Sequence, residues 1–259
     1  MRVLMVGDVI GKPGRKAFER VVPELRREHR LDLVVVNGEN AAGGFGLTLD
    51  TAHDLLDAGA DAITSGNHIW DQRDFIPHLD GELPLMRPAN YPPDAPGRGY
   101  VRVNGVVVIN LQGRVFMPEG LDSPFDAVDR ILADLEDDPP KAVVVDFHTE
   151  ATSEQGAMGW YLNGRVAAVV GTHTHVPTAD SKILPGGTAF VSDLGMTGPY
   201  NSVIGNRVED VLGRFLTAIP RRLSIPEGGP VQFNSVMVEV DNLTGKALSI
   251  QRMDQVVEP

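Results

Sequence analysis

The sequence contains no cysteine among its 259 residues. This absence excludes disulfide bonds, thiolate metal ligands and a cysteine nucleophile. The sequence also lacks the run of roughly 20 apolar residues that would span a bilayer as a helix, and its N-terminus has no signal-peptide pattern. We therefore expect a cytoplasmic protein that does not insert into a membrane.

Basic residues are scarce and scattered. The chain carries 23 Lys and Arg against 35 Asp and Glu, which gives a formal net charge of -12. Binding of long nucleic acid needs a basic surface, so we do not expect it here. A small phosphorylated substrate is compatible with this charge, because bound metal ions can supply positive charge locally.

The first half of the chain alternates predicted strands and helices. Short β-branched runs at 2–6, 31–36 and 62–64 predict buried strands, and residues 16–30 and 48–58 have helical spacing. Strands that alternate with helices in this way predict a parallel sheet.

The second half changes its pattern. Proline-rich residues 84–96 predict an irregular loop, and 100–110 and 231–253 predict hairpins. Between the hairpins, further apolar periodicity predicts a helix at 124–135 and strands at 141–147, 166–170 and 188–191. Early parallel strands followed by hairpins predict an α/β fold of two sheets packed face to face with helices outside, in a single domain over 1–259.

Candidate metal ligands follow the predicted strands. They are oxygen and imidazole side chains at five strand ends, namely Asp8, Glu39 with Asn40, Asn67, His148, and His173 with His175. In an open α/β sheet, ligands bind outside the carboxyl ends of the strands, so these segments can converge on one crevice. A mixed oxygen and imidazole shell without sulfur favours Fe, Mn or Zn.

His173 and His175 are separated by one residue. In extended backbone they would share a face about 6–7 Å apart, which suits one imidazole on each of two metal ions. Glu39 can then bridge the two ions. Taken singly, each candidate also has a structural interpretation as a turn former, a helix cap or a hydrogen-bonded histidine. Their coincidence at five strand ends predicts a dinuclear metal site.

The order of these motifs resembles the calcineurin-like metallophosphoesterase superfamily. Its pattern is an Asp after the first strand, a bridging acid after the second, Gly-Asn-His after the third, a single His, and then Gly-x-His-x-His. This chain departs twice, because Ile10 stands where a His is usual and the bridging acid is Glu39 followed by Asn40. Both departures occur in a narrower bacterial group that this sequence resembles, the YmdB-like metallophosphoesterases. The shared motifs are Gly-Asp-Val-Ile-Gly, Asn-Gly-Glu-Asn-Ala-Ala-Gly-Gly and Ser-Gly-Asn-His-Ile-Trp-Asp.

The resemblance implies a four-layer α/β/β/α sandwich and a site for two transition-metal ions, Fe first, with Mn or Zn as alternatives. It also implies hydrolysis of a small phosphodiester, a 2',3'-cyclic nucleotide, to the 3'-nucleotide. The implied ligands of one ion are Asp8, Glu39, Asn40 and His175, and those of the other are Glu39, Asn67, His148 and His173.

In the mechanism that we expect, a hydroxide that bridges the metals attacks phosphorus and His68 protonates the leaving oxygen. A role for His68 as a further ligand, or beside the ligands, is the alternative. Two other functions use the same metal core. One is a phosphomonoesterase or a broader cyclic-nucleotide phosphodiesterase. The other is a regulatory protein that binds a nucleotide or RNA with little turnover, which the presence of His68 disfavours.

The sequence does not identify the residues that bind substrate. Phe45, Trp70 and Tyr91 could line a pocket or pack in the core. The glycine-rich residues 43–46 could form a flexible loop or a phosphate cradle. The sequence also leaves open whether the chain forms a homo-oligomer.

Overall fold

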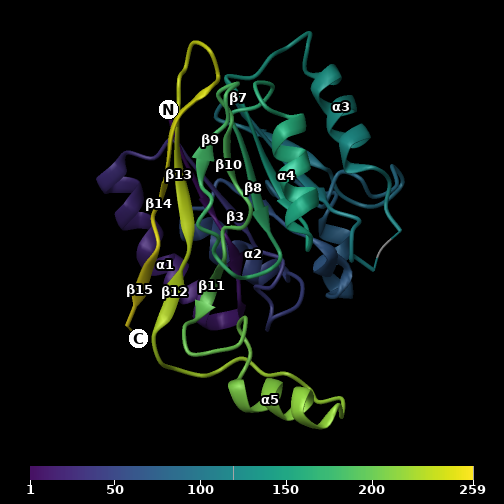
Figure 1. The fold of residues 1–259 in the computed structure, drawn as a ribbon, viewed down its shortest axis with the longest axis vertical. Coiled ribbons are helices and arrows are strands. Elements are labelled where there is room, and N and C mark those ends of the chain that lie inside the picture. Colours follow the sequence, from purple (N-terminus) through teal and green to yellow (C-terminus); the bar gives the residue numbers. More distant parts are fainter. Residues whose placement is uncertain (119, 259) are drawn as a thin grey trace.

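The computed structural model describes residues 1–118 and 120–258, and Figure 1 shows their fold. The first sheet has the strand order β14 (Ala247–Arg252), β13 (Ser235–Val240), β1 (Arg2–Val6), β3 (Leu33–Asn37) and β4 (Ala62–Thr64). The second has the order β5 (Tyr100–Val103), β6 (Val106–Gln112), β7 (Ala142–His148), β8 (Ala168–Thr172), β10 (Ala189–Val191) and β9 (Lys182–Ile183). Both sheets are mixed, because β1, β3 and β4 are parallel, as are β6, β7, β8 and β10, whereas the other pairs are antiparallel.

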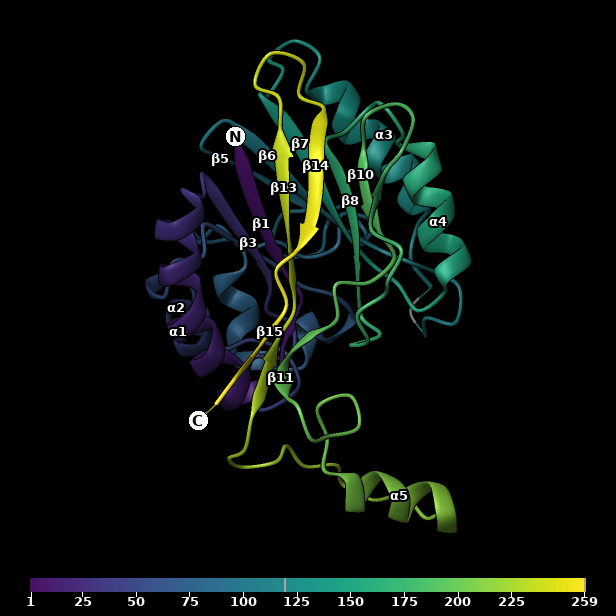
Figure 2. The ribbon, with the colours of Figure 1, turned by 60° about the vertical axis from the view of Figure 1, so that its left-hand side comes forward.

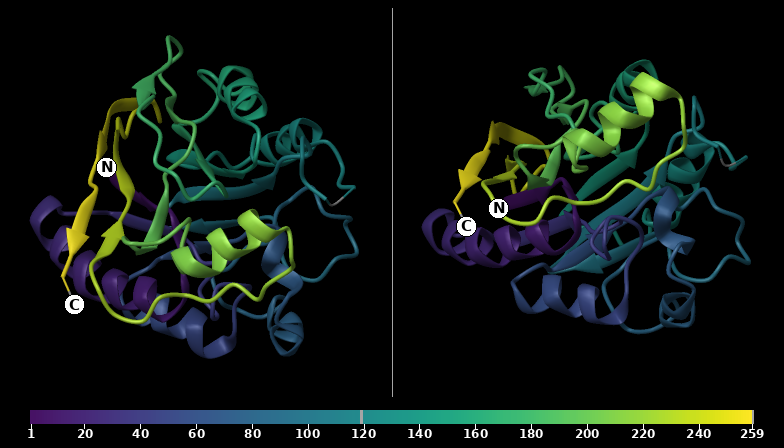
Figure 3. Two further views of the ribbon diagram at one scale, coloured as in Figure 1. Left: turned by 60° about the horizontal axis from the view of Figure 1, so that its bottom comes forward. Right: turned by 90° about the horizontal axis from the view of Figure 1, so that it is seen from below.

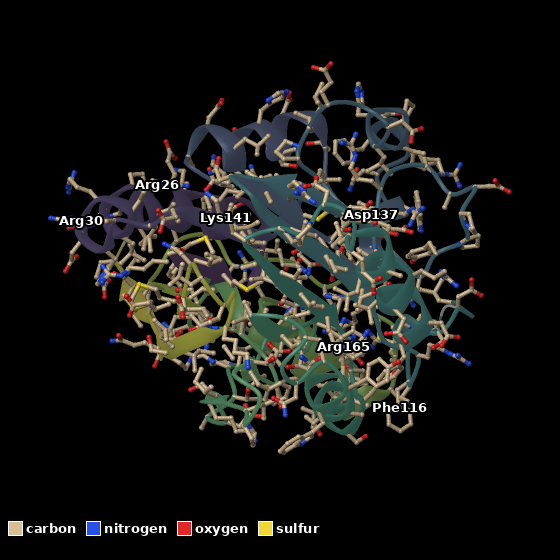
Figure 4. The ribbon with its side chains drawn as sticks, turned by 90° about the horizontal axis from the view of Figure 1, so that it is seen from above. Arg26, Arg30, Phe116, Asp137, Lys141 and Arg165 are labelled. Atoms are coloured by element: carbon tan, nitrogen blue, oxygen red, sulfur yellow. The ribbon has the colours of Figure 1, made fainter. Side chains whose placement is uncertain are left out.

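Helices cover the outer face of each sheet. On the left of Figure 3, α1 (Gly11–His29) and α2 (Leu49–Asp57), in purple and blue, lie on one side of the strands. The teal and green α3 (Pro124–Asp134) and α4 (Thr152–Tyr161) lie on the other side. In the view of Figure 4, the labelled Arg26 of α1 and Arg30 just after it lie at the left, and Arg165, which follows α4, lies in the lower right half.

Three apolar cores separate the four layers. Successive side chains of a strand point to opposite faces, so alternate residues of β1 belong to two different cores. Val3 and Met5 pack between the two sheets, and Leu4 and Val6 pack under α1 and α2. The third core lies between the second sheet and α3 and α4. The expected four-layer α/β/β/α sandwich is thereby confirmed.

A smaller sheet extends the fold beyond the first one. Its order is β15 (Gln255–Val257), β12 (Val231–Phe233), β11 (Met196–Pro199) and β2 (Asp8–Val9). The expected single strand at the start of the last hairpin is therefore wrong, because β12 and β13 are separated at Asn234 and belong to different sheets. The side-chain amide of Asn234 donates to the carbonyl of Met196, and its own carbonyl accepts the N–H of Gly7. At the break, Asn234 therefore contacts both β11 and the residue that separates β1 from β2.

The sequence does not predict α4 and α5 (Val208–Thr217), nor the two short 3-10 helices η1 (Asn67–Trp70) and η2 (Arg73–His78). α4 contains Gly156 and Gly159, which weaken helix propensity, and α5 exposes most of its apolar side chains. Figure 2 shows α5 standing away from the body of the molecule. Within the described residues, none of the helices combines the length and the apolar character that crossing a membrane requires.

The glycines of α4 generate a stability prediction. A Cβ on Gly159 would lie 2.4 Å from Cδ2 of Phe190 in β10, whereas a Cβ on Gly156 would meet no atom within 4 Å. We expect Gly159→Ala to lower the free energy of unfolding by about 1–3 kcal/mol through overpacking. Gly156→Ala should raise it by about 0.5–1 kcal/mol, because alanine favours the helix. Chemical denaturation followed by circular dichroism measures both, and equal effects would contradict the close packing of α4 on β10.

Candidate metal centre

The predicted ligands lie together where the strands end. Asp8, Glu39, Asn40 and His148 are buried, and Asn67, His173 and His175 are half-buried. Together they come from β2, β7 and the segments that follow β3, β4 and β8. Parallel strands of both large sheets end here, and this brings the distant segments into one place.

His148 lies at the centre of this cluster. Its Nε2 lies 3.0 Å from Nδ1 of His173, 3.1 Å from Oδ1 of Asn67 and 3.2 Å from Oε1 of Glu39. Ligand atoms of Glu39, His148 and His173 lie within 4.8 Å of one another. A cluster of this size can hold a metal ion.

A buried hydrogen-bond chain determines which nitrogen of His148 faces the cluster. The hydroxyl of Thr172 donates to Oδ1 of Asp146 at 2.7 Å, so it accepts the Nδ1–H of His148 at 2.9 Å. The other carboxylate oxygen of Asp146 accepts from the amide of Asn37 at 3.1 Å and from the hydroxyl of Thr64. Nε2 of His148 is thereby left for a metal ion or a proton.

His173 and His175 are oriented in the same manner. Nε2–H of His173 lies 3.2 Å from Oε2 of Glu150, which leaves Nδ1 facing His148. Nδ1–H of His175 donates to the carbonyl oxygen of Ile204 at 3.0 Å, which leaves Nε2 facing the cluster. A carboxylate or carbonyl partner on the far nitrogen is typical of histidines that bind metals.

The backbone at these two histidines differs from the expected extended strand. β8 ends at Thr172, and His173 and His175 have φ of 104° and 65°, in the left-handed region that residues other than glycine rarely adopt. The expectation of extended backbone is therefore wrong. Oδ2 of Asp193 holds the turn, because it accepts the N–H of Thr174 at 3.0 Å and its hydroxyl at 2.8 Å.

Asp8 has one oxygen that lacks a partner. Oδ2 accepts the N–H of His173 at 3.2 Å, whereas the buried Oδ1 has no hydrogen-bond partner among the described residues. Burial raises the pKa of Asp8 well above its ordinary value, and the negative charges of Asp193 and Glu39 add to this rise. A buried carboxylate oxygen without a partner is costly, and a bound cation would satisfy it.

The histidines have opposite pKa shifts. Burial opposes a charge on His148, yet the carboxylates of Glu39 and Asp8 raise its pKa to about 9. Burial also opposes ionisation of Glu39, but the charge and hydrogen bond of His148 lower its pKa to about 2. Burial and the charge of His148 lower the pKa of His173 to about 3, and burial lowers the pKa of His175. His173 and His175 are therefore neutral and can donate their lone pairs to a metal ion.

The two asparagines differ in what they present. Asn67 directs its amide oxygen at His148, as a metal ligand would. Asn40 directs its amide nitrogen at Oε1 of Glu39 and Nε2 of His175, at 3.1 and 3.2 Å. To coordinate a metal ion, Asn40 would have to use its amide oxygen. A rotation of the side-chain amide by about 180° would exchange the oxygen and the nitrogen.

The absence of a side chain at Gly66 leaves room for the side chains of Glu39 and His148. A Cβ at this position would lie 2.3 Å from Oε2 of Glu39 and 2.3 Å from Nε2 of His148. This close approach, the ring nitrogens of three histidines and the carboxylate oxygen without a hydrogen-bond partner all fit a metal ion at this site. The donor atoms are oxygen and nitrogen, and this set suits Fe, Mn or Zn.

His68 lies beside the cluster and outside it. Its Nδ1–H donates to Oδ2 of Asp71 at 2.9 Å, and its backbone N–H donates to Oε2 of Glu39 at 3.3 Å. The side chain is 28% exposed, and its ring lies 5.0 Å from that of Phe45. His68 is therefore anchored next to the candidate ligands, and its Nε2 has no hydrogen-bond partner among the described residues.

Sequence reasoning did not find several residues that orient the cluster. Asp71 lies one helical turn after His68, and Asp146 and Glu150 lie two residues before and after His148. Such spacings could have indicated them, because they place side chains on a shared face. Asp193 has no local signal, since its partner Thr174 is 19 residues away in the sequence.

The chain is similar to known proteins over nearly its whole length. The model of a family described as YmdB-like protein matches residues 4–253. A 2',3'-cyclic-nucleotide 2'-phosphodiesterase of Bacillus subtilis (strain 168) is 47% identical over 257 residues, which are 98% of this chain and 96% of the relative.

Two crystal structures have the same fold. That of a hypothetical protein from Thermus thermophilus has a TM-score of 0.92 and 42% identity, with 100% of both chains covered. That of a novel phosphatase from Mycoplasma pneumoniae has a TM-score of 0.91 and 33% identity, with 99% of this chain and 93% of the other covered.

The raised pKa of His148 generates a prediction about metal binding. In the metal-free protein at about pH 7.5, Nε2 of His148 carries a proton, and a metal ion in its place must displace that proton. We expect Mn²⁺ binding to release about one proton per chain, and the affinity to increase with pH towards the pKa of about 9. Isothermal titration calorimetry in buffers of different ionisation enthalpy counts the protons. His148→Ala should abolish this release, and binding to the unsubstituted protein without proton release would contradict the assignment.

Proposed function

The chain belongs to the YmdB-like protein family, and on this basis we propose that it hydrolyses 2',3'-cyclic nucleotides to 3'-nucleotides with two metal ions. It is a phosphoesterase, since its relatives over nearly the whole length are a phosphodiesterase and a phosphatase. The observation that carries the proposal is the set of imidazole lone pairs and carboxylate oxygens that face one another around His148.

The proposed ligands fall into two groups that share Glu39. His148, His173 and Asn67 meet at Nε2 of His148, next to Oε1 of Glu39. His175 lies on the other side, with its Nε2 3.2 Å from the amide of Asn40 and 3.9 Å from Oδ1 of Asp8. Two bound ions, Fe or alternatively Mn or Zn, would lower the pKa of a shared water and neutralise charge on the phosphoryl oxygens.

His68 is the proposed acid for the leaving group. Asp71 accepts its Nδ1–H and so orients the ring, and Nε2 stays available to protonate the 2' oxygen as its bond to phosphorus breaks. The backbone bond to Glu39 keeps this ring beside the proposed bridging acid.

A phosphomonoesterase is the alternative reaction, and the name of the Mycoplasma pneumoniae relative supports it. Both reactions would use the same metal ligands. A regulatory protein that only binds a nucleotide is disfavoured, because binding alone has no need for the His68–Asp71 pair.

Product analysis tests the reaction. Metal-loaded protein is incubated separately with 2',3'-cyclic AMP, 3',5'-cyclic AMP and 3'-AMP, with Asp8→Asn as the control for contaminating activity. We expect 3'-AMP to accumulate from 2',3'-cyclic AMP alone, because the proposed acid His68 would protonate one ester oxygen. Accumulation of 2'-AMP would reverse the assignment of the leaving oxygen. Release of inorganic phosphate from 3'-AMP at a similar rate would favour the phosphomonoesterase.

His68→Ala tests the leaving-group role. We expect turnover of 2',3'-cyclic AMP to fall by about 10²–10⁴-fold, the usual scale for general acid catalysis. The loss should be much smaller for bis-p-nitrophenyl phosphate, since nitrophenolate leaves without a proton. Elemental analysis should find the same metal content as in the unsubstituted protein. An equal loss on both substrates would indicate positioning instead of proton transfer, and a lost metal ion would make His68 a ligand.

A further inference from the structure

The sequence leaves open whether Phe45, Trp70 and Tyr91 line a pocket or pack in the core, and the structure distinguishes these cases. Tyr91 is buried, and the half-buried Trp70 packs edge-on against it with ring centroids 5.3 Å apart. Both belong to the core beneath α1 and α2. Phe45 is different, because it is 46% exposed and its ring meets that of His68 at a centroid distance of 5.0 Å and an interplanar angle of 73°.

Phe45 is held in place by its own loop. Its N–H donates to the carbonyl of Ala42 at 3.3 Å, and its carbonyl accepts from the side-chain amide of Gln72 at 2.8 Å. Gly46 has a positive φ, and a Cβ there would lie 3.1 Å from the carbonyl oxygen of His68. The loop therefore lies against the segment that carries His68, and the ring of Phe45 is positioned before any substrate binds.

The same loop does not have the features of a phosphate cradle. The N–H groups of Gly43, Gly44 and Phe45 donate to the carbonyls of Ala41, Asn40 and Ala42. A phosphate cradle needs free N–H groups that point at the ligand. What this loop offers to a substrate is the exposed aromatic ring of Phe45.

The chemistry of the substrate places its base near this ring. In a nucleoside 2',3'-cyclic phosphate the base is attached to C1', which is bonded to C2', the carbon that carries the leaving oxygen. When the 2' oxygen lies at His68, the base is therefore on the same side of the phosphorus as His68. The exposed aromatic side chain that contacts His68 is Phe45.

We propose that Phe45 is the nucleobase platform of this site, on which the base of a nucleoside 2',3'-cyclic phosphate stacks. This inference rests on the proposed function and deepens it, because it makes the base part of what the enzyme recognises. Stacking accepts every base, since each has a π-face, and purines stack with the larger area. The enzyme then discriminates cyclic phosphates that carry a base from those that do not.

A pair of substrates tests the platform. They are 2',3'-cyclic AMP and methyl riboside 2,3-cyclic phosphate, which has the same reacting ring but no base. In the unsubstituted protein we expect kcat/KM to favour the nucleotide by about 5- to 140-fold, the factor that corresponds to the contribution of one stacked base. Phe45→Ala should lower this ratio to near one, chiefly through the KM of the nucleotide, because the base does not react.

Matched variants separate stacking from folding. Phe45→Trp should keep the preference for the nucleotide, and Phe45→Leu, which keeps an apolar side chain without a ring, should lose it. Trp160→Ala is the control, because this exposed aromatic residue lies near the far end of α4, about 12 Å along the helix from its start at the candidate site.

The outcomes distinguish this inference from the proposed function. If the unsubstituted protein hydrolyses both substrates and Phe45→Ala leaves their kcat/KM ratio unchanged, the platform is refuted and the phosphodiesterase stands. If the unsubstituted protein hydrolyses neither, the proposed function fails and the platform fails with it. A ratio that falls in Phe45→Ala and Phe45→Leu, but not in Trp160→Ala, supports both.

Discussion

Buried carboxylates that face a cluster of imidazoles are the constraint on which the rest of this structure depends. Asp8, Glu39 and Asp193 lie out of contact with water, and their negative charges repel one another. One proton on His148 offsets part of this charge, and metal ions would offset more. The turn at His173 and His175, with its uncommon backbone, and the contacts of Glu150 and Ile204 all direct lone pairs at this one place.

The four-layer architecture ties both sheets to the site through one carboxylate. Asp146 in β7 accepts hydrogen bonds from Asn37 at the end of β3, Thr64 at the end of β4 and Thr172 at the end of β8. The apolar core between the sheets thus ends in a polar layer directly under the candidate ligands. This layer joins strands of both sheets, so it fixes how the first sheet presents Glu39 relative to His148 in the second.

Local patterns in the sequence predict much of this arrangement. Short β-branched runs predict the strands, and a polar residue after each run is itself the candidate ligand, as with Asn67 after β4 and His148 at the end of β7. Contacts between distant segments are invisible to such patterns. Asp193 orients a turn 19 residues earlier, and Thr172 connects Asp146 to His148 only because β7 and β8 are neighbours. The break at Asn234 and the formation of α4 have the same origin, since contacts with distant segments decide both.

The three histidines reach the cluster by different atoms, and this difference limits which side chains could replace them. His173 presents Nδ1, which is close to its own backbone, whereas His148 and His175 present the more distant Nε2. A substitute at 173 would need a donor atom at short reach, as in the amide oxygen of asparagine. Substitutes at 148 and 175 would need the longer reach of glutamine. Whether this site tolerates a mutation therefore depends on the length of the replacing side chain at each position, and not only on whether that side chain can bind a metal ion.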